Sequence, residues 1–193
     1  MRKIILTGSA PYMTQWWADN KRKLDGYEIH SMNMSIIITM DKCKKWWYSN
    51  DFFKIHPEMW QLGQSWQGEV GGGCGKSLPN VQPIPDPRLI RYDRGNTSGT
   101  SLFNVIQHFG HEHLDIGNIS EVNVVGCDLI YKEGEQNHFY IGGTPDPMRL
   151  GIELLKKNIS YLQREYDKIG IKLYNLSPNQ ESLLTFARKS LEE

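Results

Sequence analysis

Short apolar runs alternate along this chain with segments whose apolar residues recur at helical spacing. The runs KIILT at 3–7 and VNVVGCD at 122–128 are typical of buried β-strands. From 148 to 169 the apolar residues recur at spacings of four and three, which predicts a long helix facing the core. Strand and helix in alternation build open parallel sheets. We therefore predict one Rossmann-like α/β domain over residues 1–193, with a mostly parallel sheet flanked by helices and a lid rich in glycine and proline.

The same patterns, with residues that begin or end helices, predict the other elements. Further helices are expected at about 12–24, 41–48, 97–110 and 177–191. The last is opened by a capping box at Ser177-Pro178-Asn179-Gln180. Further strands are expected at 27–30, 35–39, 88–93, 139–141 and 171–174. Periodicity disappears between 56 and 87, and we expect this excursion to be the lid.

Charge and composition narrow the class of protein. Lys plus Arg and Asp plus Glu are both 22, so strong nonspecific binding to nucleic acid is not expected, although a nucleic-acid acceptor in a local groove stays open. No apolar run approaches the roughly 20 residues that span a bilayer. Three cysteines without a CxxC spacing indicate a reducing compartment, and we expect a cytoplasmic protein. The tryptophan-rich first third would suit a phage protein.

The glycine-rich segment at 71–77 imitates a phosphate-binding loop without matching it. The GxxxxGK[ST] pattern requires glycine where this chain has Val70, and no strand leads into the segment. A flexible lid that could bring Lys76 to a phosphate is the better interpretation. His108, His111 and His113 are interpreted as solvated histidines around a helix end at Gly110, and no metal site is predicted.

Three other positions have both a structural and a functional interpretation. Gly8-Ser9-Ala10-Pro11 is either a tight turn or a turn whose amides bind phosphate oxygens. Asp128 stands at the tip of a buried strand, as a turn residue or as part of a ligand pocket. His138 is either structural or a general base that removes a proton from a hydroxyl.

The order of segments resembles a known group of enzymes. The segments are, in order, GSAP after the first strand, Asn33 after the second, TSG at 97–99, VNVVGCDLIY at 122–131, HFY at 138–140 and LYNLS at 173–177. The arrangement is similar to the Rossmann-like domain of motility-accessory-factor glycosyltransferases and Campylobacter-type bacterial sialyltransferases. An archaeal hydroxymethylpterin pyrophosphokinase shares a related domain. The resemblance covers most of the chain and is best from 97 to 186.

The resemblance implies a nucleotide pocket and a set of catalytic groups. The residues implied to bind the nucleotide are Gly8, Ser9, Asn33, Thr97, Ser98, Gly99 and Asp128. His138 would be the base, and Tyr131 and Tyr140 would donate hydrogen bonds to the leaving phosphate. The implied reaction transfers a sugar from a nucleotide-activated donor to a hydroxyl acceptor. A nucleotide-dependent pyrophosphokinase or other phosphotransferase, a non-catalytic nucleotide-binding module and a homo-oligomeric state all stay open.

Overall fold

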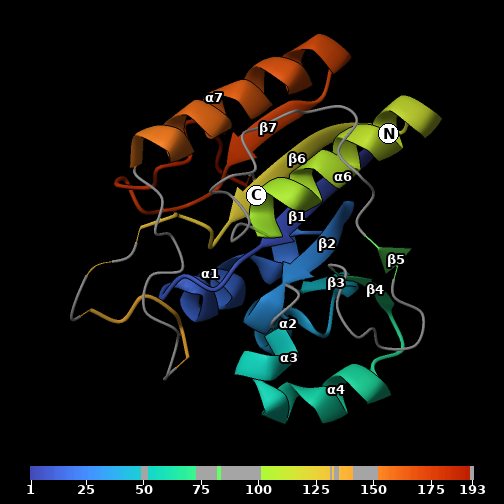
Figure 1. Cartoon of the computed structure of the whole chain (residues 1–193), viewed down its shortest axis with the longest axis vertical. Helices are drawn as coiled ribbons and strands as arrows, with labels where there is room; N and C mark the ends of the chain where they lie inside the picture. The colour runs from blue at the N-terminus through green and yellow to red at the C-terminus, as the bar shows by residue number, and fades with distance from the viewer. Residues whose placement is uncertain are drawn as a thin grey trace.

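The computed structural model describes residues 1–48, 52–72, 82–83, 101–130, 132, 135–140 and 152–191. These residues form an α/β fold with one eight-stranded sheet in the order β5-β4-β3-β2-β1-β6-β7-β8 (Figure 1). All neighbouring strands are parallel. The predicted Rossmann-like α/β class is therefore confirmed.

The elements alternate along the chain as a parallel sheet requires. The strands are β1 (Arg2–Thr7), β2 (Tyr27–Met32), β3 (Cys43–Tyr48), β4 (Glu69–Gly72), β5 (Gln82–Pro83), β6 (Ile119–Val125), β7 (Lys172–Asn175) and β8 (Ala187–Arg188). The α-helices are α1 (Met13–Asn20), α2 (Ile36–Thr39), α3 (Phe52–Ile55), α4 (Trp60–Ser65), α6 (Ser101–Ile116) and α7 (Ile152–Ile169). The 3₁₀ turns are η1 (Lys21–Lys23), η2 (Asn33–Ser35) and η3 (Pro57–Met59).

The direction of winding reverses next to β1. The chain moves outward from β1 to β5, then returns so that β6 pairs with the free side of β1, and moves outward again to β8. In this register Ile5 of β1 lies between Ile29 of β2 and Asn123 of β6. A reversal of this kind leaves the loops after the two central strands facing each other, which is where doubly wound sheets bind ligands.

Alternating side chains of the strands enter different cores on the two faces of the sheet. Ile4 and Leu6 of β1 pack in a cluster with apolar residues of α6 and α7. Ile5, between them, packs in another cluster with Met13 and Trp17 of α1. Figure 1 shows α6 and α7 side by side along β6 and β7, with α1 on the other side of the sheet. This two-faced burial follows from the period of two along a strand.

The predictions for β1, β2, β6 and β7 and for the helices α1 and α7 are confirmed within the described residues. Two neighbouring predictions are wrong. The segment expected as a helix at 41–48 contains strand β3, and the segment expected as a strand at 35–39 is helical. Trp46 and Trp47 alternate into opposite cores, with 0% and 1% exposure. Lys45 is buried as well, its Nζ 4.5 Å from the centre of a Trp47 ring.

Helix α6 does not end at Gly110 as predicted. It continues to Ile116, and Gly110 is buried within it, so His108, His111 and His113 are half-buried helical residues and not solvated loop histidines. The helix expected at 177–191 is also absent: turns and bends follow β7, and strand β8 comes after them. Residues 139–140 form bends, not the expected strand.

The described residues of the excursion at 56–87 contain helices and strands, contrary to the irregular structure predicted. These elements are η3, α4, β4 and β5, and β4 leads into the glycine-rich segment, where no strand was predicted. Gly71 belongs to β4, and a Cβ there would lie 2.1 Å from the Trp47 ring, so close packing explains this glycine. Most of the glycine-rich segment, with Lys76, and the strand expected at 88–93 lie outside the described residues.

Candidate functional site

The candidate site lies at the carboxyl edge of the sheet, where β1 and β6 end side by side. The Gly8 amide donates to the carbonyl of Val125 at 2.8 Å, and the Ala10 amide donates to the carbonyl of Gly126 at 3.0 Å. A Cβ on Gly8 would lie 2.3 Å from the Gly126 carbonyl oxygen and from Cys127 Sγ. The two loops therefore touch backbone to backbone, and Gly8 has a packing role here whatever else it does.

The predicted base, His138, contacts the loop after β1. Ser9 Oγ lies 2.9 Å from His138 Nδ1, and the Phe139 amide donates to the carbonyl of Ser9 at 3.0 Å. The His138 ring stacks on Tyr140 at 5.0 Å between centroids, and His56 meets Tyr140 edge-on at 5.6 Å. The structure thus brings together Ser9, His138 and Tyr140, which are far apart in sequence.

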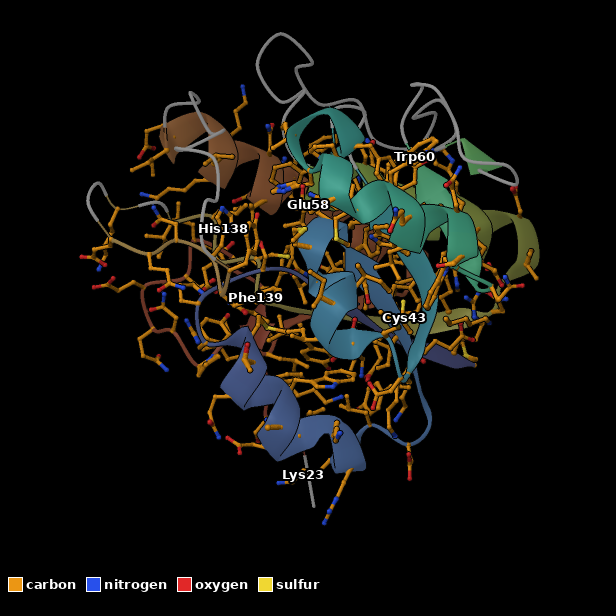
Figure 2. All side chains as sticks on the ribbon, turned by 90° about the horizontal axis from the view of Figure 1, so that it is seen from below. Lys23, Cys43, Glu58, Trp60, His138 and Phe139 are labelled. Carbon is orange, nitrogen blue, oxygen red and sulfur yellow. The ribbon has the colours of Figure 1, made fainter. Side chains whose placement is uncertain are left out.

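Figure 2 shows His138 and Phe139, which belong to the segment after β6, beside the helical segment that carries Glu58. Phe139 packs against both the α1 core cluster and the cluster that contains Phe52 and Met59. Buried aromatic contacts on two sides fix the position of a segment that has no regular secondary structure. His138 is consequently held by its neighbours in sequence as well as by Ser9.

Burial sets the protonation of the two aromatic groups. The pKa of His138 is lowered, mainly by burial and further by the nearby His56, while its contact with Ser9 opposes the shift. The pKa of Tyr140 is raised, mainly by burial. At neutral pH the imidazole is therefore an uncharged base and the phenol keeps its proton, so the pair can accept one proton and donate one hydrogen bond.

Asp128 lies at the tip of β6, as predicted, within a network of hydrogen bonds. The Tyr12 hydroxyl lies 3.1 Å from Asp128 Oδ1 and 2.8 Å from Ser177 Oγ, and it accepts a hydrogen bond from the Gly126 amide at 3.1 Å. Asn179 donates to the other carboxylate oxygen at 3.3 Å. Burial, and next the charge of Asp128, raises the pKa of Tyr12. Asp128 therefore joins the ends of β1, β6 and β7.

Sequence reasoning missed Tyr12, Ser177 and Asn179 as members of this edge. Tyr12 was expected within the first helix, and Ser177 and Asn179 in a capping box. Their positions did carry a signal, because Tyr12 directly follows the turn after β1 and Ser177 closely follows β7. Carboxyl ends of parallel strands meet at one edge, so polar residues just after them are candidates for one site.

Backbone strain concentrates at the same edge. Among the described residues other than glycine, only Asn33 and Leu129 have positive φ, at 48° and 58°. Asn33 follows β2 and Leu129 follows Asp128, so each is close to the end of a strand. Left-handed backbone is costly for a residue such as leucine, and strained positions of this kind cluster at functional sites. The carbonyl of Asn33 accepts a hydrogen bond from Trp46 Nε1 at 2.9 Å, which helps to fix this conformation.

The remaining predicted site residues are Thr97, Ser98, Gly99 and Tyr131, and they lie outside the described residues. Within the described ranges, no three His, Cys, Asp or Glu side chains are grouped as ligands of one metal ion. No helix among the residues described has the length and apolar content that crossing a membrane requires.

Comparison with known proteins yields no relative of this chain. No protein-family model matches it, no curated protein matches it, and no solved structure matches it. The functional interpretation therefore rests on the fold and on the contacts at the carboxyl edge.

Proposed function

We propose that this chain is a glycosyltransferase-like enzyme that transfers a sugar from a nucleotide-activated donor to a hydroxyl acceptor. The observation that carries the proposal is the contact between Ser9, at the end of the central strand, and His138, which stacks on Tyr140. An uncharged imidazole next to a protonated phenol suits a reaction in which one oxygen loses a proton while another gains negative charge.

In the proposed reaction the acceptor oxygen attacks the anomeric carbon of the donor. Its proton moves to Nε2 of His138, in the tautomer whose Nδ1–H donates a hydrogen bond to Ser9 Oγ. The bond from the anomeric carbon to the phosphate oxygen breaks, and the electron pair stays on that oxygen. Tyr140 donates a hydrogen bond to the departing phosphate, with Tyr131 as the second proposed donor. Ser9 is thus a positioning residue, because it fixes the ring that takes the proton.

Gly8, Ser9, Asn33 and Asp128 are proposed to line the nucleotide pocket at the β1–β6 edge. Two features support this location: it is the reversal point of the sheet, and strained residues follow two of its strands. Asp128 is proposed to shape the pocket and not to react, since both of its carboxylate oxygens lie next to hydrogen-bonding groups of Tyr12 and Asn179.

Replacing His138 by alanine tests the proposal. His138→Ala should lower turnover at least about 100-fold, the usual contribution of a general base, while nucleotide binding is retained. Nucleotide release from a panel of nucleotide sugars, with a hydroxyl acceptor present, measures turnover, and calorimetric titration measures nucleotide binding. His111→Ala, on α6, is the matched control and should behave as the wild type. Normal transfer by His138→Ala would show that the base is misassigned, and nucleotide binding without turnover by the wild type would indicate a binding module.

A further inference from the structure

A polar cavity of about 390 Å³ lies at the amino edge of the sheet, opposite the Ser9–His138 pair. It is lined by residues of the first four strands, by His108 and Glu112 of α6, and by Asn118, which precedes β6. In Figure 1 the N-terminus lies beside the last turns of α6, which is the same region. Cavities of roughly 300–1,000 Å³ are of the size that binds small molecules.

The charged groups around the cavity are balanced in number and paired with one another. They are Arg2, Lys44, Lys45, Glu28, Glu69 and Glu112. Arg2 donates to both carboxylate oxygens of Glu28, at 2.7 and 2.8 Å, and also contacts Glu112. Lys44 lies 3.0 Å from Glu28, and Lys45 lies 3.7 Å from Glu69. A charged ligand would have to separate these pairs, so the lining favours an uncharged one.

Residues that line the cavity have hydrogen-bonding capacity that the described protein groups do not use. Three side-chain atoms of residues that line the cavity are buried and have no hydrogen-bond partner: His30 Nε2, His108 Nδ1 and Asn118 Oδ1. His30 is 3% exposed, and its Nδ1 accepts a hydrogen bond from Trp47 Nε1 at 3.0 Å, so Nε2 bears the proton. The nearest carboxylate oxygen, on Glu28, is 3.7 Å from Nε2, which is too long for a hydrogen bond.

These side chains thus offer at least one hydrogen-bond donor and one acceptor, and they are uncharged at neutral pH. The pKa of His108 is lowered to about 4, mainly by burial and next by the charge of Lys45. The charge of Glu112 opposes this shift, and His30 and His111 add to it. The pKa of His30 is also lowered, mainly by burial, against the opposing effect of Glu28. A hydroxyl group can accept from His30 Nε2 and donate to Asn118 Oδ1, which no purely anionic or cationic group can do.

We propose that this cavity binds a small uncharged polyhydroxyl compound, a polyol or a sugar, through His30, His108 and Asn118. Small movements of the side chains that cover the three unpartnered atoms bring its hydroxyl groups within hydrogen-bond distance of them, while the ion pairs around the cavity remain intact. The site lies at the opposite edge of the sheet from the proposed catalytic residues, so its occupancy does not depend on the proposed function.

Titration of the full chain with myo-inositol and with glucose tests the proposal. Histidine side-chain ¹⁵N resonances should move for His30 and His108 and not for His138, with saturation below about 10 mM. His108→Phe and Asn118→Leu should each weaken binding more than tenfold. His111→Phe changes a histidine of the same helix that does not line the cavity, and it should bind like the wild type.

The wild-type titration decides the matter even if a variant fails to fold, and Asn118→Ser supplies a milder change at the same position. Absence of shifts at both histidines up to about 10 mM would mean that water alone occupies the cavity, which overturns the proposal. Shifts produced by inorganic phosphate or magnesium chloride, and by neither polyol nor sugar, would overturn it as well, because the ligand would then be an ion.

Discussion

Gly8 and Gly126 let the loops after β1 and β6 touch backbone to backbone. Their contact sets how Ser9 leaves the sheet, because Ser9 directly follows Gly8 and the Ala10 amide bonds to Gly126. A methyl group on Gly8 would meet a carbonyl oxygen and a buried sulfur, neither of which can move without shifting a strand end. The geometry of Ser9 and His138 therefore depends on the absence of one side chain.

Gly8→Ala should lower the free energy of unfolding by about 3 kcal/mol, at the upper end of the usual cost of overpacking. Urea denaturation followed by tryptophan fluorescence measures this. Gly68→Ala is the control, because the three atoms nearest to its Cβ all belong to the ring of the half-buried Trp66, which can turn aside, and it should cost under about 1 kcal/mol. Equal losses in the two variants would contradict the packing role assigned to Gly8.

Individual residues of the site were predictable from the sequence, but their contacts were not. Ser9 and Asp128 follow apolar strands, and that position alone makes them candidates. Ser9 and His138 are 129 positions apart in the chain, and their contact depends on the packing of Phe139 in two cores. Tyr12 was missed because a tyrosine at the start of an apolar helix is normally a packing residue, and only the fold shows its hydroxyl next to Asp128.

Strand β3 shows how burial on both faces obscures an element in the sequence. A strand covered on both sides lacks the alternation of apolar and polar residues that identifies a half-exposed one. In β3 two tryptophans enter opposite cores and Lys45 is buried over the Trp47 ring, so the mixture of polar and apolar residues at 41–48 resembled that of an amphipathic helix. Gly110 misled in a similar way, because a glycine buried inside a long helix resembles a helix end.

Close packing of Gly71 in β4 against the Trp47 ring of β3 can be tested by mutation. Gly71→Ala should lower the free energy of unfolding by about 1–3 kcal/mol, since its Cβ would lie 2.1 Å from the ring of Trp47, which is 1% exposed. The double variant Gly71→Ala, Trp47→Phe should lose less than the sum of its single changes, because the smaller ring makes room. Strict additivity in urea denaturation would mean that the two residues do not compete for the same space.

At the scale of the whole molecule, uncharged buried histidines make stability depend on pH. In the unfolded chain His30 and His108 take up protons near pH 6.5, whereas burial lowers both pKa values in the folded state, that of His108 to about 4. Below pH 6.5 the unfolded state binds more protons, so stability falls as pH falls, until the folded state is protonated too.

The free energy of unfolding should therefore decrease between pH 6.5 and 4, and His108 should contribute on the order of 1 kcal/mol after screening by solvent in the cavity. Urea denaturation across this range measures the slope. His108→Phe should reduce the slope, while His111→Phe should leave it as in the wild type. An unchanged slope in His108→Phe would show that this imidazole becomes protonated in the folded protein as easily as in the unfolded chain.

The pairing of β1 with β6 has a consequence for biosynthesis. Ile5 pairs with Asn123, so a ribosome must add more than a hundred residues before the second side of the first strand is covered. Until then the strand KIILT has an uncovered edge with unpaired amides and carbonyls, which invites pairing with other nascent chains. Such distant pairing also slows folding, because a long loop must close before the contact forms. Chaperone demand during translation should thus be greatest just before β6 leaves the ribosomal tunnel.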